Sequence, residues 1–197
     1  MESDRDASPA PARRSPSSDA PRAWLAALLM PSRLVLAWIL LAAAWRRLVL
    51  APAKHDMTSE AWLGHKINTF HPHATWPIHD VLEILLRHPR WLDAFAWLFT
   101  GTELLVGALV LLGLASRLAG VLVVGLGVGL MHTSGWLGPT CLSEWHTASL
   151  MIVAGLPLAA AGSGGRSLDA LLARRFPRLA RWRPWAWLAE PGAGAGA

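Results

Sequence analysis

The sequence predicts an all-α integral membrane protein, a four-helix bundle with an extracytoplasmic loop cap between helices one and two. Apolar residues make up 53% and charged residues 16% of the 197 positions. The apolar residues gather in blocks of about 20, the length at which a helix crosses the hydrocarbon of a bilayer. None of these blocks alternates as a barrel strand does, and backbone in lipid must satisfy its own hydrogen bonds. The blocks are therefore expected to be helices.

Four spans are expected, at residues 32–50, 91–114, 118–136 and 145–161. Three or four helices of this kind close as a bundle, so residues 23–165 are predicted to form one transmembrane domain. The first block also resembles the core of a secretory signal, because Arg33 precedes an apolar run that ends in Ala42–Ala44. Arg33 lies far from the start of the chain, which favours a retained span.

The two tails differ from the spans in composition. Residues 1–22 are rich in Ser, Pro, Ala and Arg and are expected to be a disordered cytoplasmic tail. Residues 166–197 place leucines at helical spacing opposite arginines and then several tryptophans. That pattern is typical of a basic amphipathic segment lying on the cytoplasmic leaflet, although a solvated helix fits it too.

Basic residues set the expected orientation. The two tails, Arg33 at the start of the first span and the turn between spans two and three carry twelve of the 18 basic residues. The positive-inside rule then places both termini in the cytoplasm of a multi-pass cell-membrane protein, with the first loop and the last turn outside. The net charge of +5 favours anionic membrane lipid as a partner, and no nucleic acid is expected.

The turn before the fourth span carries the most specific motif. It reads Gly135-Trp136-Leu137-Gly138-Pro139-Thr140-Cys141, followed by Glu144-Trp145. This run resembles the signature of the DoxD small subunit of thiosulfate:quinone oxidoreductase, within the DoxX-like group of four-helix membrane proteins. Three further motifs agree: Pro52-Ala53-Lys54, the loop from Lys66 to Pro77, and Leu112 to Leu118. The resemblance covers about Arg33 to Asp169.

The resemblance implies an activity in which thiosulfate is oxidised to tetrathionate and the electrons pass to membrane quinone. It also implies a soluble DoxA-like partner subunit, which this chain does not contain. The alternative is a non-catalytic DoxX-like membrane scaffold that binds a redox partner. A single cysteine and the lack of a haem attachment motif indicate that the chain carries no metal or haem of its own.

Such chemistry requires positive charge outside the membrane to bring two thiosulfate dianions together. The expected donors are Arg46, Arg47, Lys66, His71 and His73, with Trp136 and Glu144 of the last turn beside them. Quinone reduction consumes two protons, so titratable groups should adjoin an apolar slot. The candidates for that relay are Glu103, His132, Glu144 and His146.

Glu103 is the most informative of these residues because it lies inside the expected span 91–114. An ionised side chain at mid-bilayer costs about 3 kcal/mol, so it should face the bundle interior, on the side that also bears Thr100 and Gly107. Its depth exceeds that of Arg46, so we expect it to be protonated or hydrogen-bonded rather than salt-bridged. Trp38, at the same depth, is the expected hydrogen-bond donor, and both residues are candidates for quinone binding. A purely structural contact is the alternative.

Three other features leave alternatives open. His132 shares a helix face with Gly125 and Gly129, a pair of small residues expected to permit close helix approach, so it either bonds in a packed seam or relays protons. Cys141 is either structural or the acceptor of a thiosulfate sulfur. Six of the eight histidines lie in the first loop, but none offers a recognised metal-ligand spacing, so no metal site is expected. One short loop helix is predicted at Ile78–Arg87.

Overall fold

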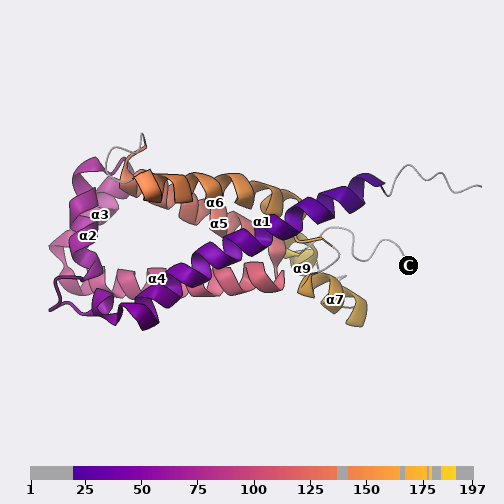
Figure 1. Ribbon diagram of the computed structural model, residues 1–197, viewed down its shortest axis with the longest axis horizontal. Coiled ribbons are helices and arrows are strands. Elements are labelled where there is room, and N and C mark those ends of the chain that lie inside the picture. The colour runs from indigo at the N-terminus through magenta and orange to yellow at the C-terminus, as the bar shows by residue number, and fades with distance from the viewer. Residues whose placement is uncertain (1–19, 137–141, 165–166, 177, 179–182, 190–197) are drawn as a thin grey trace, which may run out of the picture.

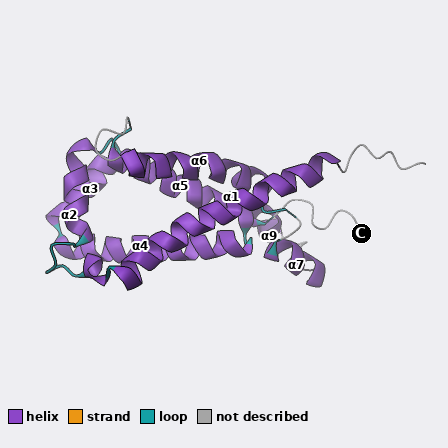
Figure 2. Ribbon diagram, in the orientation of Figure 1, coloured by secondary structure: helices purple, strands orange, loops and turns teal. Residues whose placement is uncertain are grey.

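The computed structural model describes residues 20–136, 142–164, 167–176, 178 and 183–189. Every regular element within these ranges is a helix, as Figure 2 shows, so the all-α class is confirmed. The expected tail 1–22 is wrong at its boundary, because the first helix already begins at Ala20. Residues 1–19 lie outside the described part of the chain.

Four long helices run along the molecule (Figure 1): α1 (Ala20–Trp45), α4 (Pro89–Leu112), α5 (Ser116–Ser134) and α6 (Leu142–Ala161). Helices α5 and α6 pack together along one side, and α1 crosses obliquely to pack against α4. All four contribute to one apolar core, in which every side chain is nearly inaccessible. Its members are Leu36, Ala37, Leu40, Val106, Val110, Ala119, Val123, Met151 and Leu158.

Glycine permits the close packing of α5 against α6, but not the glycines that the sequence suggested. A Cβ added at Gly120 would lie 2.3 Å from the backbone nitrogen of Ala159, and one at Gly127 would lie 2.9 Å from the Ala148 oxygen. A Cβ at Gly125 or Gly129 would meet nothing within 4 Å. The expected pair was therefore wrong, because those two glycines occupy a face of α5 that does not pack against α6.

Helices α4 and α5 are each long and apolar enough to cross a bilayer. Only 33% of the most apolar stretch of either helix is buried, unlike the core helix of a soluble protein. The other two expected spans correspond to α1 and α6, whose 26 and 20 residues also have sufficient length. The four-helix membrane bundle and its extracytoplasmic cap stay predictions.

The segment between α1 and α4 folds at one end of the long helices (Figure 1). It contains the π-helical turn η1 (Arg46–Leu50), the 3-10 turns η2 (Pro52–His55) and η3 (His71–His73), and helices α2 (Leu63–Phe70) and α3 (Ile78–Arg87). The predicted helix Ile78–Arg87 is confirmed, whereas α2 was not anticipated. Ile67 of α2 and Leu82 of α3 pack on Leu92 near the start of α4. The first turns of α4 therefore pack against α2 and α3, and the part of α4 that packs against α1 follows later in the helix.

Two buried charges fasten the opposite end of the long helices. Helix α4 ends at Leu112 and is followed by Gly113, whose φ of +64° is readily adopted only by glycine. Arg33 donates to the carbonyl oxygens of Val110 (3.1 Å) and Leu111 (2.8 Å), and Asp169 accepts from the backbone nitrogens of Ala115 (2.8 Å) and Ser116 (2.9 Å). These bonds satisfy helix-end groups that otherwise lack partners.

The C-terminal segment is therefore tied to the bundle at its start. Asp169 belongs to helix α7 (Leu168–Arg175), and its side chain is only 1% exposed. Further along, Leu171, Arg174 and Phe176 are exposed, and a last short helix, α9 (Arg183–Leu188), follows. Placement of residues 166–197 on the cytoplasmic leaflet stays a prediction.

Candidate functional site

A buried ion pair joins the first and second long helices near their loop end. The guanidinium of Arg47, from the π-helical turn η1, binds both carboxylate oxygens of Glu103 on α4. The Nη2–Oε1 distance is 3.0 Å. The two side chains are 10% and 9% exposed, so the pair is almost fully removed from solvent. A two-pronged geometry of this kind fixes the orientation of both groups.

The expectation that Glu103 lacks a salt bridge was therefore wrong. That expectation assumed that the end of α1 and the start of α4 lie at the same depth. In the structure the first turns of α4 pack against α2 and α3 instead. This offset brings Arg47 down to the level of the carboxylate. Trp38 is 74% exposed on the outside of α1, so it is not the hydrogen-bond donor that the sequence suggested for Glu103, and Arg46 is exposed.

Thr100 extends the ion pair into a chain of polar contacts. Its hydroxyl oxygen accepts from Arg47 Nη1 at 3.3 Å and lies 3.2 Å from Nε2 of His55. The guanidinium also lies 5.2 Å from the ring centre of Phe99, close enough for a cation-π interaction. Thr100 is buried, and a Cβ on Gly107 would lie 2.9 Å from Leu41, which confirms the inward face predicted for this side of α4.

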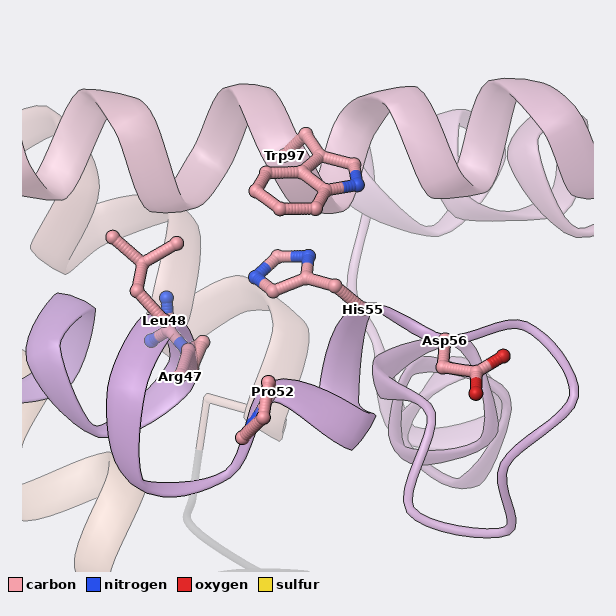
Figure 3. A pocket seen from close by; sticks show the side chains of 6 residues that line it. All are labelled: Arg47, Leu48, Pro52, His55, Asp56 and Trp97. Carbon is pink, nitrogen blue, oxygen red and sulfur yellow. The ribbon is translucent and has the colours of Figure 1, made fainter.

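His55 and Trp97 form one wall of a cavity beside this chain (Figure 3). Their rings stack with centres 4.0 Å apart and an angle of 26° between planes. The cavity has a volume of about 200 Å³. Its lining residues are Arg47, Leu48, Pro52, His55, Asp56 and Trp97.

Sequence reasoning missed both ring residues of this cavity. His55 directly follows the motif Pro52-Ala53-Lys54, which is the one signal that could have drawn attention to it. Burial lowers the pKa of His55, and the nearby charge of Arg47 lowers it further, with partial opposition from Asp93. The uncharged imidazole is therefore favoured at neutral pH.

Cations gather around the same end of the molecule. Burial lowers the pKa of Lys54, and the charges of Arg46, Lys66 and Arg47 lower it further, with Glu144 opposing them. Lys66 also forms an ion pair with Glu144, which lies in the first turn of α6. The structure thus brings together Arg46, Arg47, Lys66 and Glu144 from the predicted substrate site, and it adds Lys54.

The other predicted site residues lie away from the ion pair, or outside the residues that the structure describes. His132 contacts Thr75 through Nδ1 at 2.6 Å, and its carbonyl oxygen accepts from the Thr75 nitrogen at 2.9 Å, so it ties the loop to α5. Its ring also lies 5.3 Å from that of Trp136, whose carbonyl oxygen accepts from Trp145 Nε1. His73 is exposed at the end of η3. Cys141 lies outside the described residues.

No grouping of three or more metal-binding side chains occurs among the residues that the structure describes. His71 instead stacks on His79, with ring centres 4.5 Å apart. His146 lies against Trp145 at 5.7 Å and is exposed.

A family model described as the small subunit DoxD of thiosulfate:quinone oxidoreductase matches residues 28–189. The chain belongs to the DoxD family. The match begins within α1 and continues through the loop to the C-terminal helix α9. It therefore extends beyond the range of the sequence motifs, Arg33 to Asp169, at both ends. No solved structure matches this DoxD chain.

Family membership bears on the setting of the site. DoxD proteins are membrane-associated subunits of an oxidoreductase, so a partner subunit is implied for this chain. The family also implies quinone as electron acceptor. Among the residues that the structure describes, the buried Arg47–Glu103 pair and its neighbours combine titratable side chains with an adjoining cavity.

Proposed function

We propose that this chain is the multi-pass membrane subunit of a thiosulfate:quinone oxidoreductase, with both termini in the cytoplasm. It takes part in oxidising thiosulfate to tetrathionate and in passing the electrons to membrane quinone. The observation that carries the proposal is the buried pair Arg47–Glu103, connected through Thr100 to His55 and surrounded by cations. Ionisable groups placed at this depth in apolar helices are commonly functional.

The cationic end supplies the sulfur chemistry with charge. Two thiosulfate dianions each give up one electron and form one S–S bond, and they repel one another until nearby cations neutralise them. Arg46, Lys54 and Lys66 are the proposed anion contacts, while Glu144 positions Lys66 through their ion pair. His73 and Trp136 are kept as outer contacts, and the Cys141 thiol as a candidate acceptor of a thiosulfate sulfur.

The buried pair supplies the quinone side. A quinone that receives two electrons also takes up two protons, so groups able to exchange protons must connect its oxygens with water. Arg47 binds both Glu103 and Thr100, and Thr100 contacts His55, so we propose that Glu103 and His55 exchange protons at the two ends of this chain while Arg47 holds the carboxylate in place. His132 holds the loop against α5 through Thr75, and we propose that it positions this end of the protein.

Membranes that contain the chain and its partner subunit test the proposal by thiosulfate-dependent reduction of a soluble quinone analogue. Glu103→Gln and Arg47→Gln should each lower the rate at least about tenfold, because general acid-base groups contribute that much or more. Arg87→Gln is the matched control, since its exposed pair with Glu83 lies on α3 at the same end. Wild-type membranes that reduce no quinone with the partner present would instead favour the non-catalytic scaffold.

Orientation has its own test. A thiol reagent that cannot cross membranes should label Cys141 from the outer face of intact cells. Labelling from the cytoplasmic face alone would reverse the proposed topology, in which residues 1–22 and 166–197 lie inside and residues 23–165 form the transmembrane domain.

A further inference from the structure

The cavity beside the buried ion pair has the size and lining of a site for one aromatic ring. A cavity of about 150 Å³ is known to hold benzene, so about 200 Å³ is enough for a substituted six-membered ring. Leu48, Pro52 and Trp97 give it apolar walls, while Arg47, His55 and Asp56 supply polar groups (Figure 3). Flat apolar walls with a few polar groups suit a planar ring with polar substituents.

His55 lines this cavity and carries a hydrogen-bonding atom that is not used within the described structure. Its Nδ1 is buried and has no hydrogen-bond partner in the described structure. Because the Thr100 hydroxyl accepts from Arg47, its own hydrogen is available to Nε2 of His55. The proton of a neutral imidazole then resides on Nδ1, which leaves this atom as a donor in need of an acceptor.

Asp93 carries an unused acceptor near His55. It lies one helical turn before Trp97 on α4, it acts electrostatically on His55, and its buried Oδ1 has no hydrogen-bond partner within the described residues. A quinone oxygen accepts a hydrogen bond as a carbonyl and can donate one after reduction to a hydroxyl. Asp93 is not among the residues that line the cavity, so of these two groups only His55 belongs to its wall, and the donor of His55 suits the carbonyl oxygen of a quinone.

The surroundings of the cavity suit a lipid-soluble ligand. Trp45, Val49 and Leu50 precede it at the end of α1 and in η1, and their side chains are 58%, 50% and 69% exposed. Trp97 and Leu98 of α4 are 50% and 69% exposed beside it. A hydrophobic tail attached to a bound ring could lie over this apolar surface. A small hydrophilic metabolite would gain no binding free energy from contact with this apolar surface.

We propose that the cavity lined by Leu48, Pro52, His55 and Trp97 binds the ring of a membrane quinone, with His55 as its hydrogen-bonding partner and the stacked His55–Trp97 pair as its aromatic wall. This inference rests on the proposed function for the identity of the ring. It assigns the ring to the junction of η1, η2 and α4, and not to Trp38 on the outer surface of α1.

Photolabelling of the full-length protein tests the site without requiring turnover. The purified chain in lipid vesicles is irradiated with an azido-quinone, in the absence of thiosulfate and of any partner subunit. The label should be recovered from residues 46–56 or from Trp97, and excess unlabelled quinone should suppress it. Recovery of the label only from other segments, or no suppressible labelling at all, would overturn the proposal.

The chain offers a matched control pair at the start of α4. His88 and Trp91 also lie in ring contact, at 4.6 Å, but neither lines the cavity. His55→Asn and Trp97→Ala should each lower labelling about fivefold, the effect of losing one ordinary hydrogen bond or ring contact. His88→Asn and Trp91→Ala should leave it unchanged. An equal loss in both pairs would contradict the assignment.

Two further variants protect the test against misfolding. Trp97→Phe keeps an aromatic wall and should retain labelling, whereas Leu48→Trp fills the cavity from a partly exposed position and should abolish it. Labelling that survives Leu48→Trp in a folded protein would refute the site. Suppressible labelling without thiosulfate oxidation would refute the oxidoreductase alone, and turnover with labelling elsewhere would refute this cavity alone.

Discussion

Helix α1 and its π-helical extension bury two arginines, 14 positions apart in sequence, in different surroundings. Arg33 donates to backbone carbonyl oxygens at the end of α4, and the neighbouring Asp169 accepts from backbone nitrogens at the start of α5. Within the described part of the chain, Arg47 binds side-chain oxygens only, those of Thr100 and Glu103. The first arrangement serves helix ends, and the second connects groups that can change protonation.

The difference teaches how to separate structural charges from reactive ones in this protein. Backbone groups do not titrate, so the end that holds Arg33 and Asp169 has a fixed hydrogen-bonding pattern. The Arg47–Glu103 end adjoins a cavity, and the buried Nδ1 of His55, a residue that lines it, has no hydrogen-bond partner among the described residues. Unsatisfied buried polar atoms are costly, which is why their position beside a cavity points to ligand binding.

The largest expected effect comes from breaking the Arg47–Glu103 pair on one side only. Glu103→Leu should destabilise the fold by about 3–5 kcal/mol, because the guanidinium left behind cannot lose its charge. Arg47→Leu should cost less, since a carboxyl group can become neutral by taking up a proton. Thermal unfolding in detergent measures both.

The double variant Arg47→Leu/Glu103→Leu provides the control for that experiment. It should recover most of the lost stability, because no unpaired charge remains buried. It should still fail to reduce quinone. A double variant with normal turnover would show that this pair is as structural as Arg33 and Asp169.

A smaller effect is expected at the opposite end. Asp169→Ala leaves the nitrogens of Ala115 and Ser116 and the Ser116 hydroxyl without their acceptor, which should cost about 2–3 kcal/mol. Quinone labelling should stay at the wild-type level in the protein that remains folded. The exposed Asp80 of α3 provides a control, since Asp80→Ala should change neither quantity. If Asp169→Ala lost quinone labelling without losing stability, the Arg33–Asp169 end could not be purely structural.

The smallest expected effect is on the pH dependence of stability. Burial and Arg47 hold the pKa of His55 below the value of 6.5 of an unperturbed histidine. The unfolded chain therefore binds the proton more readily, and the folded state loses stability as pH falls below 6.5 until the folded pKa is passed.

Unfolding temperatures measured between about pH 7.5 and pH 5 detect this contribution. The wild type should lose more stability over that range than His55→Asn, whereas His88→Asn should follow the wild type. A steeper decline in His55→Asn than in the wild type would reverse the sign and contradict a neutral His55.

Several features were predictable because they depend on local pattern. Apolar blocks of helical length gave the all-α class, and the helix Ile78–Arg87 followed from its own spacing. Glu103 was predicted to face inward because a carboxylate facing lipid is expensive, and Thr100 and Gly107 on the same face confirm it. The prediction of which glycines pack closely was wrong. Gly120 and Gly127 differ from Gly125 and Gly129 only in lying on the face of α5 that packs against α6.

The sequence alone determined the helical class, the family and the inward carboxylate, because periodicity, motif and the cost of burying a charge are properties of short segments. Only the tertiary structure decided that Arg47 is its partner and that His55 and Trp97 stack to form one wall of a cavity. Those contacts depend on α2 and α3 packing over the first turns of α4, which shifts α1 along it. The offset between two helices depends on the elements that pack around them, so it cannot be predicted from the sequence of either helix alone.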